Sequence, residues 1–515
     1  GGQSGLSDFD DVSPDAEIVL DFTAALDAAT VEANIYLLDA GGAKVDASDV
    51  YDGAKRVTLK PSAGLNAYAS YRLIVDSGLK SAAGEAILTG KVIRIRTGLD
   101  TSDKFPQISD EELLTKVQQQ TFRYFWEGAE PTSGMARERT SSGATVTTGG
   151  TGFGVMAMTV AAERGFVTRS EACQRVQRIV TFLAERATSY HGAFSHWIDG
   201  QTGQTLPFSA DDNGADLVET GLLFQGLLTA RAYFDGADAA ESKLRADITA
   251  LWEAVEWDFF TKEGTEKVLY WHWSPDKGWA MNMPIQGWNE ALIVYVLAAS
   301  SPTHPIGREV YAEGWARGGA MRNGKLFYDT VLPLGEDYGG PLFWAQYSFL
   351  GLNPRGLSDA YADYWEQVCN HTRINYAYCV DNPKGYAGYG ADCWGLTASD
   401  IPDGYTASSP TNDRGVIAPT AALSSMPYTP DESMAALRFF YYKLGDKLWS
   451  DYGFIDAFDL TTGWFDRGMH IAIDQGPIVV MIENYRTGLP WNLFMSDKDV
   501  QRGLAELGFT VEAGS

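Results

Sequence analysis

Two kinds of helical segment alternate from residue 108 onward, and this alternation constrains the fold more than any other feature. One kind is amphipathic and charged: Ser109–Gly128, Thr168–Ala187, Glu241–Phe260, Pro305–Gly318 and Ser358–Tyr378. The other is apolar and interrupted by glycine: Gly152–Ala162, Asp216–Phe234, Asn289–Ser300, Gly340–Leu352, Pro430–Leu444 and Gly476–Gly488. Because a helix that is apolar nearly all round is buried on most sides, the pattern predicts an inner ring of six helices enclosed by an outer ring.

An open solenoid would also alternate its helices, but its repeats would have a fixed length of about 34 to 47 residues. Here the apolar segments begin at irregular intervals and are separated by long inserts rich in glycine and aromatic residues. The spacing therefore favours a closed toroid whose loops build one face. No outer helix can be assigned between Asp446 and Phe458.

Residues 1–100 follow a period of two, which is typical of strands. Ile18, Leu20 and Phe22 alternate with less apolar neighbours, and the same alternation recurs around residues 57–59, 71–75 and 93–95. This predicts a small β-sandwich, followed by a linker at residues 98–106. We expect two domains, 1–100 and 107–515, the first acting as a spacer or, alternatively, as a sugar-binding module.

The charge balance excludes some partners. With 67 acidic and 40 basic residues, the net charge is −27, which disfavours nucleic acids and acidic polysaccharides because the field of the protein repels polyanions. No apolar run reaches the length of a transmembrane helix. The start of the chain, Gly1–Gly5, is typical either of a remnant of expression cloning or of a mature terminus from which a targeting segment has been removed. We expect an exported monomer.

The sequence predicts neither a cofactor nor a metal. The four cysteines lack the spacing of a zinc site, although a Cys369–Cys379 or a Cys379–Cys393 disulfide remains open. The six histidines are scattered, and a calcium loop aligned on Gly214 fails at both of its anchor positions. A nucleophile elbow, a zinc-protease motif and a phosphate loop are all absent.

Acidic residues gather instead where apolar helices are expected to begin. Asp212 or Asn213 can cap one helix, which places Asp216 and Glu219 on neighbouring positions of its first turns. A capping cluster alone would account for one of these carboxylates but poorly for three, because the rest of the helix is apolar.

Two later apolar helices begin in the same way. Glu290 follows Trp288 in the predicted first turn of one, and Asp474 precedes Pro477 at the predicted start of another, with Glu483 and Arg486 further along. If the inner helices run in one direction, these carboxyl groups converge on a single cavity. His470 and Trp197 are further candidates for that site, although each is also compatible with a structural role.

Hydrolysis of a glycosidic bond is the chemistry that such a cavity suggests, because one carboxylic acid protonates the leaving oxygen while a carboxylate activates water. Tryptophans near the helix starts could stack on sugar rings. Three classes remain open: a glycan hydrolase, a polysaccharide lyase on the same toroid, and a glycan-binding protein without catalysis.

Several strings of the chain resemble, in order, those of the bacterial glucoamylase-like proteins of glycoside hydrolase family 144. They are Gly149–Gly154, Gly192–Ile198, Asp212–Glu219, Trp288–Ala291 and Asp474–Arg486. The resemblance covers roughly residues 108–510. It implies an (α/α)6 toroid and an inverting hydrolase of a neutral glucan, most specifically β-1,2-glucan; another glucan hydrolase of the glucoamylase type is the alternative.

The resemblance also assigns roles to residues. It implies that Glu290 is the general acid and that Asp212, Asp216 and Glu219 line the substrate cleft. We expect Asp474 on the side of the base, with Glu483 as the alternative. The first hundred residues resemble a bacterial immunoglobulin-like domain, which implies an exported enzyme, either periplasmic or an outer-membrane lipoprotein.

Overall fold

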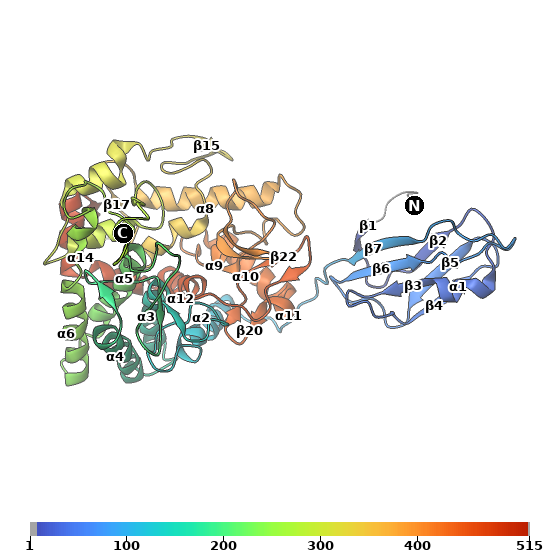
Figure 1. Cartoon of the computed structure of the whole chain (residues 1–515), viewed down its shortest axis with the longest axis horizontal. Helices are drawn as coiled ribbons and strands as arrows, with labels where there is room; N and C mark the ends of the chain where they lie inside the picture. Colours follow the sequence, from blue (N-terminus) through green and yellow to red (C-terminus); the bar gives the residue numbers. More distant parts are fainter. Residues whose placement is uncertain (1–7, 513–515) are drawn as a thin grey trace. The chain divides into compact units, whose positions relative to one another are not determined.

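A computed structural model describes residues 8–512 of the chain, which divides into two compact units, one ending at Asp103 and one beginning at Lys104. Figure 1 shows the strands of the first unit and the helices of the second. Within the described residues, no helix combines the length and the apolar character needed to cross a membrane. The four cysteines are buried free thiols, so neither of the two disulfides left open by the sequence is formed.

The first unit contains two sheets. The larger has the strand order β1 (Asp8–Val12), β7 (Lys91–Thr97), β6 (Ser70–Val75) and β3 (Ile35–Leu38). The smaller has the order β2 (Ile18–Asp21), β5 (Arg56–Pro61) and β4 (Ala47–Tyr51), and a short helix, α1 (Ala28–Asn34), precedes β3. Alternate residues such as Val57, Leu59 and Leu73 are buried in a shared core, as the period of two predicts.

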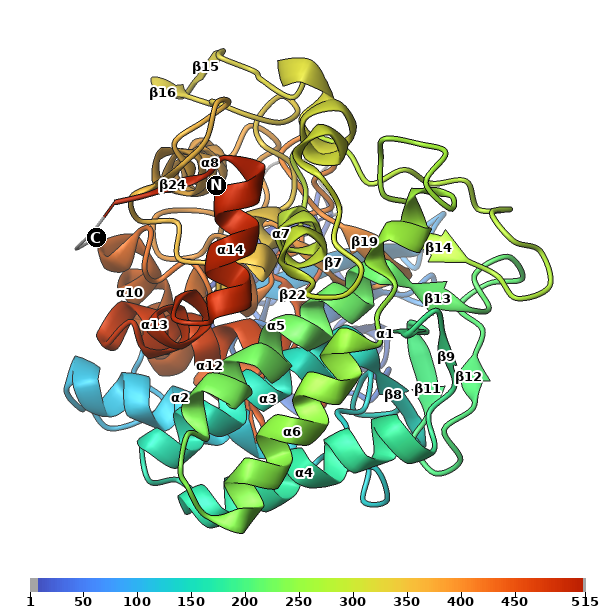
Figure 2. The ribbon, with the colours of Figure 1, turned by 90° about the vertical axis from the view of Figure 1, so that its left-hand side faces the viewer.

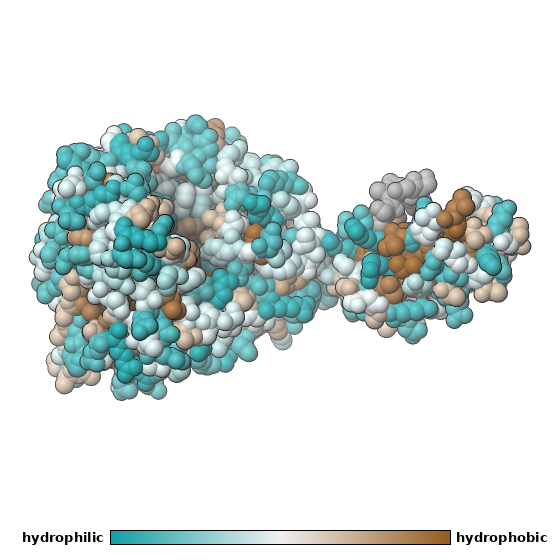
Figure 3. All heavy atoms as spheres, in the orientation of Figure 1, coloured by the Kyte–Doolittle hydropathy of each residue, from teal (hydrophilic) through white to brown (hydrophobic). Residues whose placement is uncertain are grey.

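Some apolar side chains of this unit remain at its surface. Phe9, Val19, Val50, Leu88 and Val92 are all exposed, and brown patches are visible on the face of this unit that is turned to the reader in Figure 3. The surface of the helical unit in the same view is mostly hydrophilic.

The apolar segments of the second unit are buried and pack on one another. They are α3 (Thr148–Glu163), α5 (Leu217–Tyr233), α7 (Leu292–Ser300), the 3-10 turns η4 (Leu342–Ala345) and η5 (Tyr347–Phe349), α9 (Pro419–Leu423) and α12 (Ala472–Arg486). Along this series α5 packs on α3 and α7, α7 packs on η5, α9 packs on α12, and α12 packs on α3. Gln346, beside η4, donates to the carbonyl of Ala421 in α9.

Charged helices cover this series from outside. They include α2 (Asp110–Trp126), α4 (Arg169–Glu185), α6 (Ala239–Glu253), α8 (Tyr364–Asp381), α10 (Pro430–Arg438) and α14 (Lys498–Leu507). Figure 2 shows α4 and α6 lying beside α3 and α5, in agreement with the contacts of α4 with α3 and α6 and of α6 with α5. The amphipathic pattern of these segments thus reflects one buried face and one solvated face.

Glycine allows the closest approach between the inner helices. A Cβ atom on Gly152 would lie 2.3 Å from the Leu222 carbonyl oxygen, and one on Gly226 would lie 2.0 Å from the Gly152 carbonyl oxygen. Atoms cannot come this close, so α3 and α5 require glycine at both positions. This explains why the apolar segments of the sequence are interrupted by glycine.

Three predicted helices differ from the structure. Residues 430–444 form the amphipathic α10 and a π-helical turn, η6 (Phe439–Lys443), whereas the fully buried helix is the shorter α9. Residues 340–352 contain only η4 and η5. The segment 305–318 is mainly a π-helical turn, η2 (Val310–Trp315). Short buried segments carry too few residues to reveal a helical period.

Candidate active site

The start of α5 holds the first cluster of carboxyl groups. Asp216, in the short strand β13 (Ala215–Asp216), pairs with β14 (His272–Trp273) and caps α5, since its Oδ1 accepts from the Glu219 N–H at 2.9 Å. The expected cap at Asp212 or Asn213 is therefore wrong, because the β13–β14 pairing keeps the chain extended up to Asp216. The Nδ1 atom of His196 lies 3.1 Å from Asp216 Oδ2, and His272 Nε2 lies 3.4 Å from Asp212 Oδ2.

Glu219 is fixed by the start of the neighbouring helix. The Gly149 N–H in the first turn of α3 donates to Glu219 Oε2 at 2.6 Å, an interaction that the unpaired N–H groups of a helix N-terminus favour. A Cβ atom at residue 149 would lie 2.6 Å from the same oxygen. The glycine-rich string 149–154 thus serves helix packing and carboxylate binding, although a short strand, β8 (Thr145–Thr147), directly precedes its helix.

One histidine offsets part of the negative charge in this first cluster. Burial opposes the charged form of His196, but Glu219, Asp216 and Asp212 outweigh it and raise the pKa of this histidine to about 9. Burial and the neighbouring Asp216 raise the pKa of Asp212 to about 7. Burial lowers the pKa of His272. His196 is therefore a cation that neutralises part of the cluster at neutral pH.

Glu290 lies beside this cluster, just before α7. It precedes the N-cap Ala291, so it lies immediately outside the helix rather than in its first turn as expected. Burial raises the pKa of Glu290 to about 7, and the negative charges of Asp216 and Glu219 contribute in the same direction. This carboxyl group consequently retains a proton near neutral pH while the adjacent Asp216, whose pKa is lowered by His196 against the effect of burial, is ionised.

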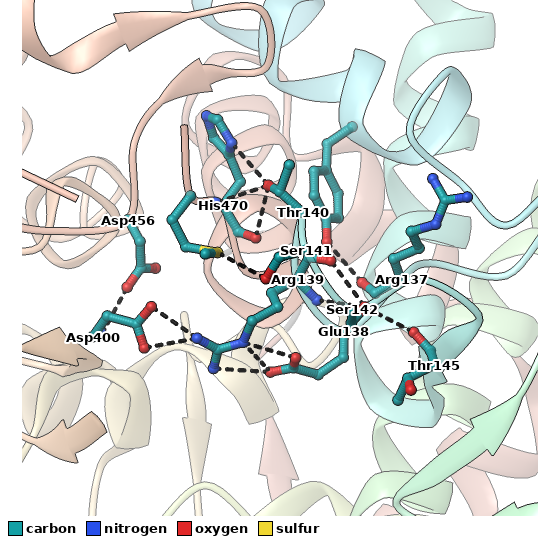
Figure 4. Close-up of polar contacts among 12 residues, drawn as sticks. Arg137, Glu138, Arg139, Thr140, Ser141, Ser142, Thr145, Asp400, Asp456 and His470 are labelled. Carbon is teal, nitrogen blue, oxygen red and sulfur yellow. Dashed lines mark hydrogen bonds and ion pairs between the residues drawn. The ribbon is translucent and has the colours of Figure 1, made fainter. Parts of the chain in front are cut away.

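A second cluster forms around Arg139 (Figure 4). The Arg139 guanidinium donates to Glu138 and, through Nη1, to both oxygens of Asp400 at 3.0 and 2.8 Å. The Asp400 N–H donates to Asp456 Oδ2 at 2.8 Å. Asp400 lies in β18 (Ala398–Ile401), whereas Asp456 follows the short strand β21 (Gly453–Phe454).

Asp474, in the first turn of α12, belongs to this second cluster. Burial raises its pKa well above the ordinary value, and the neighbouring Asp456 raises it further. Burial likewise raises the pKa of Asp456 and of Asp466 to about 7 each. Pro477 lies inside α12 and not at its first position, because the helix begins earlier, at Ala472.

Tyr347 on η5 connects the two clusters. Burial raises the pKa of its hydroxyl, and the charges of Asp474, Glu290 and Glu219 each add to the shift. Because such interactions weaken with distance, this side chain lies near members of both clusters. The Tyr347 hydroxyl has no hydrogen-bond partner among the described residues.

Glu483 and Arg486 lie at the opposite end of α12. Nine residues separate Glu483 from Asp474, which corresponds to about 14 Å along a helix. Glu483 accepts from Arg164 at 2.5 Å and from Gln118 at 3.0 Å, and Arg486 donates to Gln118 and to Glu111. The structure thus places these two residues in an ion-pair network that joins α2, α3 and α12, away from both clusters.

Three other predicted site residues have different surroundings. His470 is buried between Thr140 and Ser450, and burial lowers its pKa to about 4, so it is a neutral structural residue. Trp288 is 4% exposed, and its indole N–H contacts His371, so it presents no free face to a sugar. Trp197 is partly exposed beside the ring of His196 and is the one of the three that adjoins the first cluster.

Several members of the site were not predicted from the sequence. The sequence offered no reason to select His196 and His272 from the six histidines. The loops and short strands of the second cluster have no helical pattern, and they contain Arg139, Asp400, Asp456 and Asp466. The strings Gly192–Ile198 and 137–142 lie between predicted helices, and the position of a polar loop at the end of a buried helix is the signal that could have identified them.

Two neighbouring carboxyl groups whose pKa values are shifted in opposite directions, as in Glu290 and Asp216, are typical of hydrolases that use acid–base catalysis, among them the glycoside hydrolases. A family model described as "Putative glucoamylase" matches residues 282–498, and one described as "Bacterial Ig-like domain" matches residues 7–94.

Solved structures of close similarity cover the helical unit. A protein from Bacteroides uniformis, whose structure is named as that of a putative glucoamylase, is 58% identical with a TM-score of 0.77 over 79% of this chain and 99% of its own. An endo-β-1,2-glucanase from Chitinophaga pinensis is 51% identical with a TM-score of 0.77 over 78% of this chain and 99% of its own. The chain belongs to this family, the bacterial glucoamylase-like proteins of glycoside hydrolase family 144, which confirms the resemblance of its sequence.

A curated relative is also similar. The exo β-1,2-glucooligosaccharide sophorohydrolase (non-reducing end) of Parabacteroides distasonis is 48% identical over 421 residues, which cover 78% of this chain and 58% of the relative. The present chain therefore spans little more than half the length of that curated protein.

Proposed function

We propose that this protein hydrolyses β-1,2-glucan or its oligosaccharides by an inverting acid–base mechanism. The names of the Chitinophaga and Parabacteroides relatives support the substrate. The raised pKa of Glu290, beside an Asp216 carboxyl group whose pKa is lowered, is the observation that carries the mechanism, since a general acid needs a pKa near the working pH.

The proposed roles follow from the two clusters. Glu290 donates its proton to the glycosidic oxygen as the bond to the anomeric carbon breaks. Asp474 accepts a proton from the water that attacks this carbon from the opposite side. Asp212, Asp216, Glu219 and Trp197 contribute to substrate binding, whereas Glu483, Arg486, Trp288 and His470 are assigned to the scaffold.

We further propose that the helical unit is a closed (α/α)6 toroid. The order of contacts supports this, because α3, α5, α7, η4 with η5, α9 and α12 follow one another and α12 packs back on α3. In a six-membered ring, the third member, α7, lies opposite the sixth, α12. Glu290 and Asp474 would then approach a sugar from two sides, as inversion requires.

The organisation of the chain completes the proposal. We assign residues 1–100 to the immunoglobulin-like domain and 107–515 to the hydrolase domain. Export to the periplasm or the outer membrane is supported by the match to a bacterial Ig-like domain. A monomer is expected.

Product analysis on a panel of linear α- and β-glucans tests the substrate. We expect cleavage of β-1,2-glucan with saturated reducing-end products, and no increase in ultraviolet absorbance. Products whose new anomeric centre is α by early NMR spectra would establish inversion. Cleavage of other linkages alone, or an unsaturated product, would overturn the proposal. The product length distinguishes release of disaccharides from cleavage within the chain.

A further inference from the structure

The second carboxyl cluster has an excess of acidic groups over cations. Glu138 and Asp400 pair with Arg139, but Asp456, Asp466 and Asp474 form no ion pair with a basic side chain among the described residues. In the first cluster, by contrast, the cationic His196 pairs with Asp216. Burial of unpaired carboxylates is unfavourable, which is why the pKa values of Asp456, Asp466 and Asp474 are raised; a bound cation would compensate the same charges.

Oxygen atoms in this cluster also lack hydrogen-bond partners. Asp456 Oδ1, Asp466 Oδ2 and both carboxyl oxygens of Asp474 are buried and have no N–H or hydroxyl donor among the described residues, although the carboxyl groups of Asp456 and Asp474 lie within hydrogen-bond reach of each other. Asp456 is 2% and Asp474 is 1% exposed. Because buried polar atoms are nearly always satisfied in native proteins, and a proton shared by Asp456 and Asp474 satisfies only part of these four oxygens, the remainder indicate a further, positively charged partner.

The geometry of three members suits a bound ion. One carboxylate oxygen each from Asp400, Asp456 and Asp466 lies within 4.8 Å of the other two. Oxygens that surround a Ca²⁺ ion at about 2.3–2.6 Å are separated from one another by distances up to about 5 Å. Every donor is a carboxylate, and carboxylates prefer hard cations such as Ca²⁺ and Mg²⁺ over zinc or copper.

We propose that a divalent cation of this hard class binds between Asp400, Asp456 and Asp466, next to Asp474. The Arg139 guanidinium holds Asp400 from the other side, as Figure 4 shows. Asp400 comes from β18, Asp456 follows β21 and Asp466 follows β23 (Trp464–Phe465). The ion therefore joins three loops that are separate in the sequence and contributes to their stability.

The test measures cation binding directly and does not depend on hydrolysis. The full-length protein is treated with a chelator and then titrated separately with CaCl₂ and MgCl₂ by calorimetry, with thermal unfolding recorded in parallel. Asp466→Asn removes one ligand charge while preserving size. Asp403→Asn is the matched control, because Asp403 is an exposed residue in the same β18–β19 hairpin, where β19 is Gly404–Ala407. Asp212→Asn tests the first cluster.

We expect one ion per chain in the wild type and in the Asp403→Asn and Asp212→Asn variants, with a melting temperature that rises with cation concentration. Asp466→Asn should weaken the binding at least tenfold while its melting temperature without cation stays equal or higher. The proposal is overturned if neither cation binds at millimolar concentration, if Asp466→Asn binds as tightly as the wild type, or if Asp212→Asn abolishes binding. Failure of the cation proposal would leave the proposed hydrolysis standing, because binding is measured without substrate. Likewise, failure of the proposed hydrolysis would leave the cation proposal standing.

Discussion

Replacement of Glu290 by glutamine tests the proposed general acid most directly. With a pKa of about 7, half of the Glu290 side chains carry a proton at pH 7. A solvated glutamate with the ordinary pKa of 4.5 would be protonated in only about 1 molecule in 300 at that pH, because each pH unit changes the ratio tenfold. The burial of Glu290 thus multiplies the amount of available acid by more than a hundredfold.

Glutamine has the shape of the protonated acid but cannot release a proton. We therefore expect kcat on linear β-1,2-glucan to fall by about 10²–10⁴-fold, the usual contribution of a positioned acid, while KM changes less. The assay is the release of reducing ends. The melting temperature should not fall, because glutamine is a neutral isostere and removes the cost of burying the ionised half of these carboxyl groups.

The pH dependence gives a second readout. The wild-type rate should decrease above about pH 7, as Glu290 loses its proton, and this decrease should be absent from the residual activity of Glu290→Gln. Glu313→Gln is the control, since Glu313 pairs with Lys267 at the surface with a 57% exposed side chain. A residual rate within tenfold of the wild type, or an unchanged high-pH decrease in the variant, would refute the assignment.

Three further predictions concern stability. Gly152→Ala should destabilise the helical unit by about 1–3 kcal/mol or more, because its Cβ atom would lie 2.3 Å from the backbone of α5. Unfolding by denaturant measures this loss. The control is Gly390→Ala, which should be nearly neutral because the nearest atom to its Cβ lies at 3.9 Å. Arg164→Met should lower the free energy of unfolding by about 3–5 kcal/mol because it leaves the buried Glu483 without its ion-pair partner. The kcat of the folded variant should stay near the wild-type value. A large loss of kcat with unchanged stability would instead indicate that Glu483 belongs to the active site. Burial lowers the pKa of His371 to about 4, so as the pH falls this histidine binds a proton in the unfolded chain before it does so in the folded protein. The free energy of unfolding should therefore decline by about 3 kcal/mol between pH 6.5 and pH 4. If the melting temperature of His371→Asn showed the same acid dependence as that of the wild type, this prediction would be contradicted.

Local sequence patterns were sufficient to predict a helix or a strand wherever the segment is long and has one dominant environment. The apolar helices α3, α5 and α12 and the charged helices α2, α4 and α8 extend over 15 residues or more, so their period is repeated several times and is unambiguous. The β-strands of the first unit follow the same logic with a period of two. By contrast, α9 has only 5 residues, which is too short for its pattern to be distinguished from that of a buried loop.

The carboxyl groups show a different limit of prediction from sequence. Asp216, Glu219, Glu290 and Asp474 were found because acidic residues are conspicuous next to apolar helix starts. Their protonation could not be predicted, because a pKa depends on burial and on neighbouring charges that come from distant segments. Glu483 has the same side chain as Glu290, yet Arg164 from α3 makes its carboxylate an ion-pair partner.

The sequence by itself therefore determined the two units, the alternation of inner and outer helices, the family and the residues at several helix starts. Each of these is a local property, or a set of strings read in chain order. Only the tertiary structure decided which carboxyl groups share a cluster, because loops without periodicity bring Arg139, Asp400, Asp456 and Asp466 together. The same packing separates Glu483 from Asp474, since residues nine positions apart on a straight helix cannot meet.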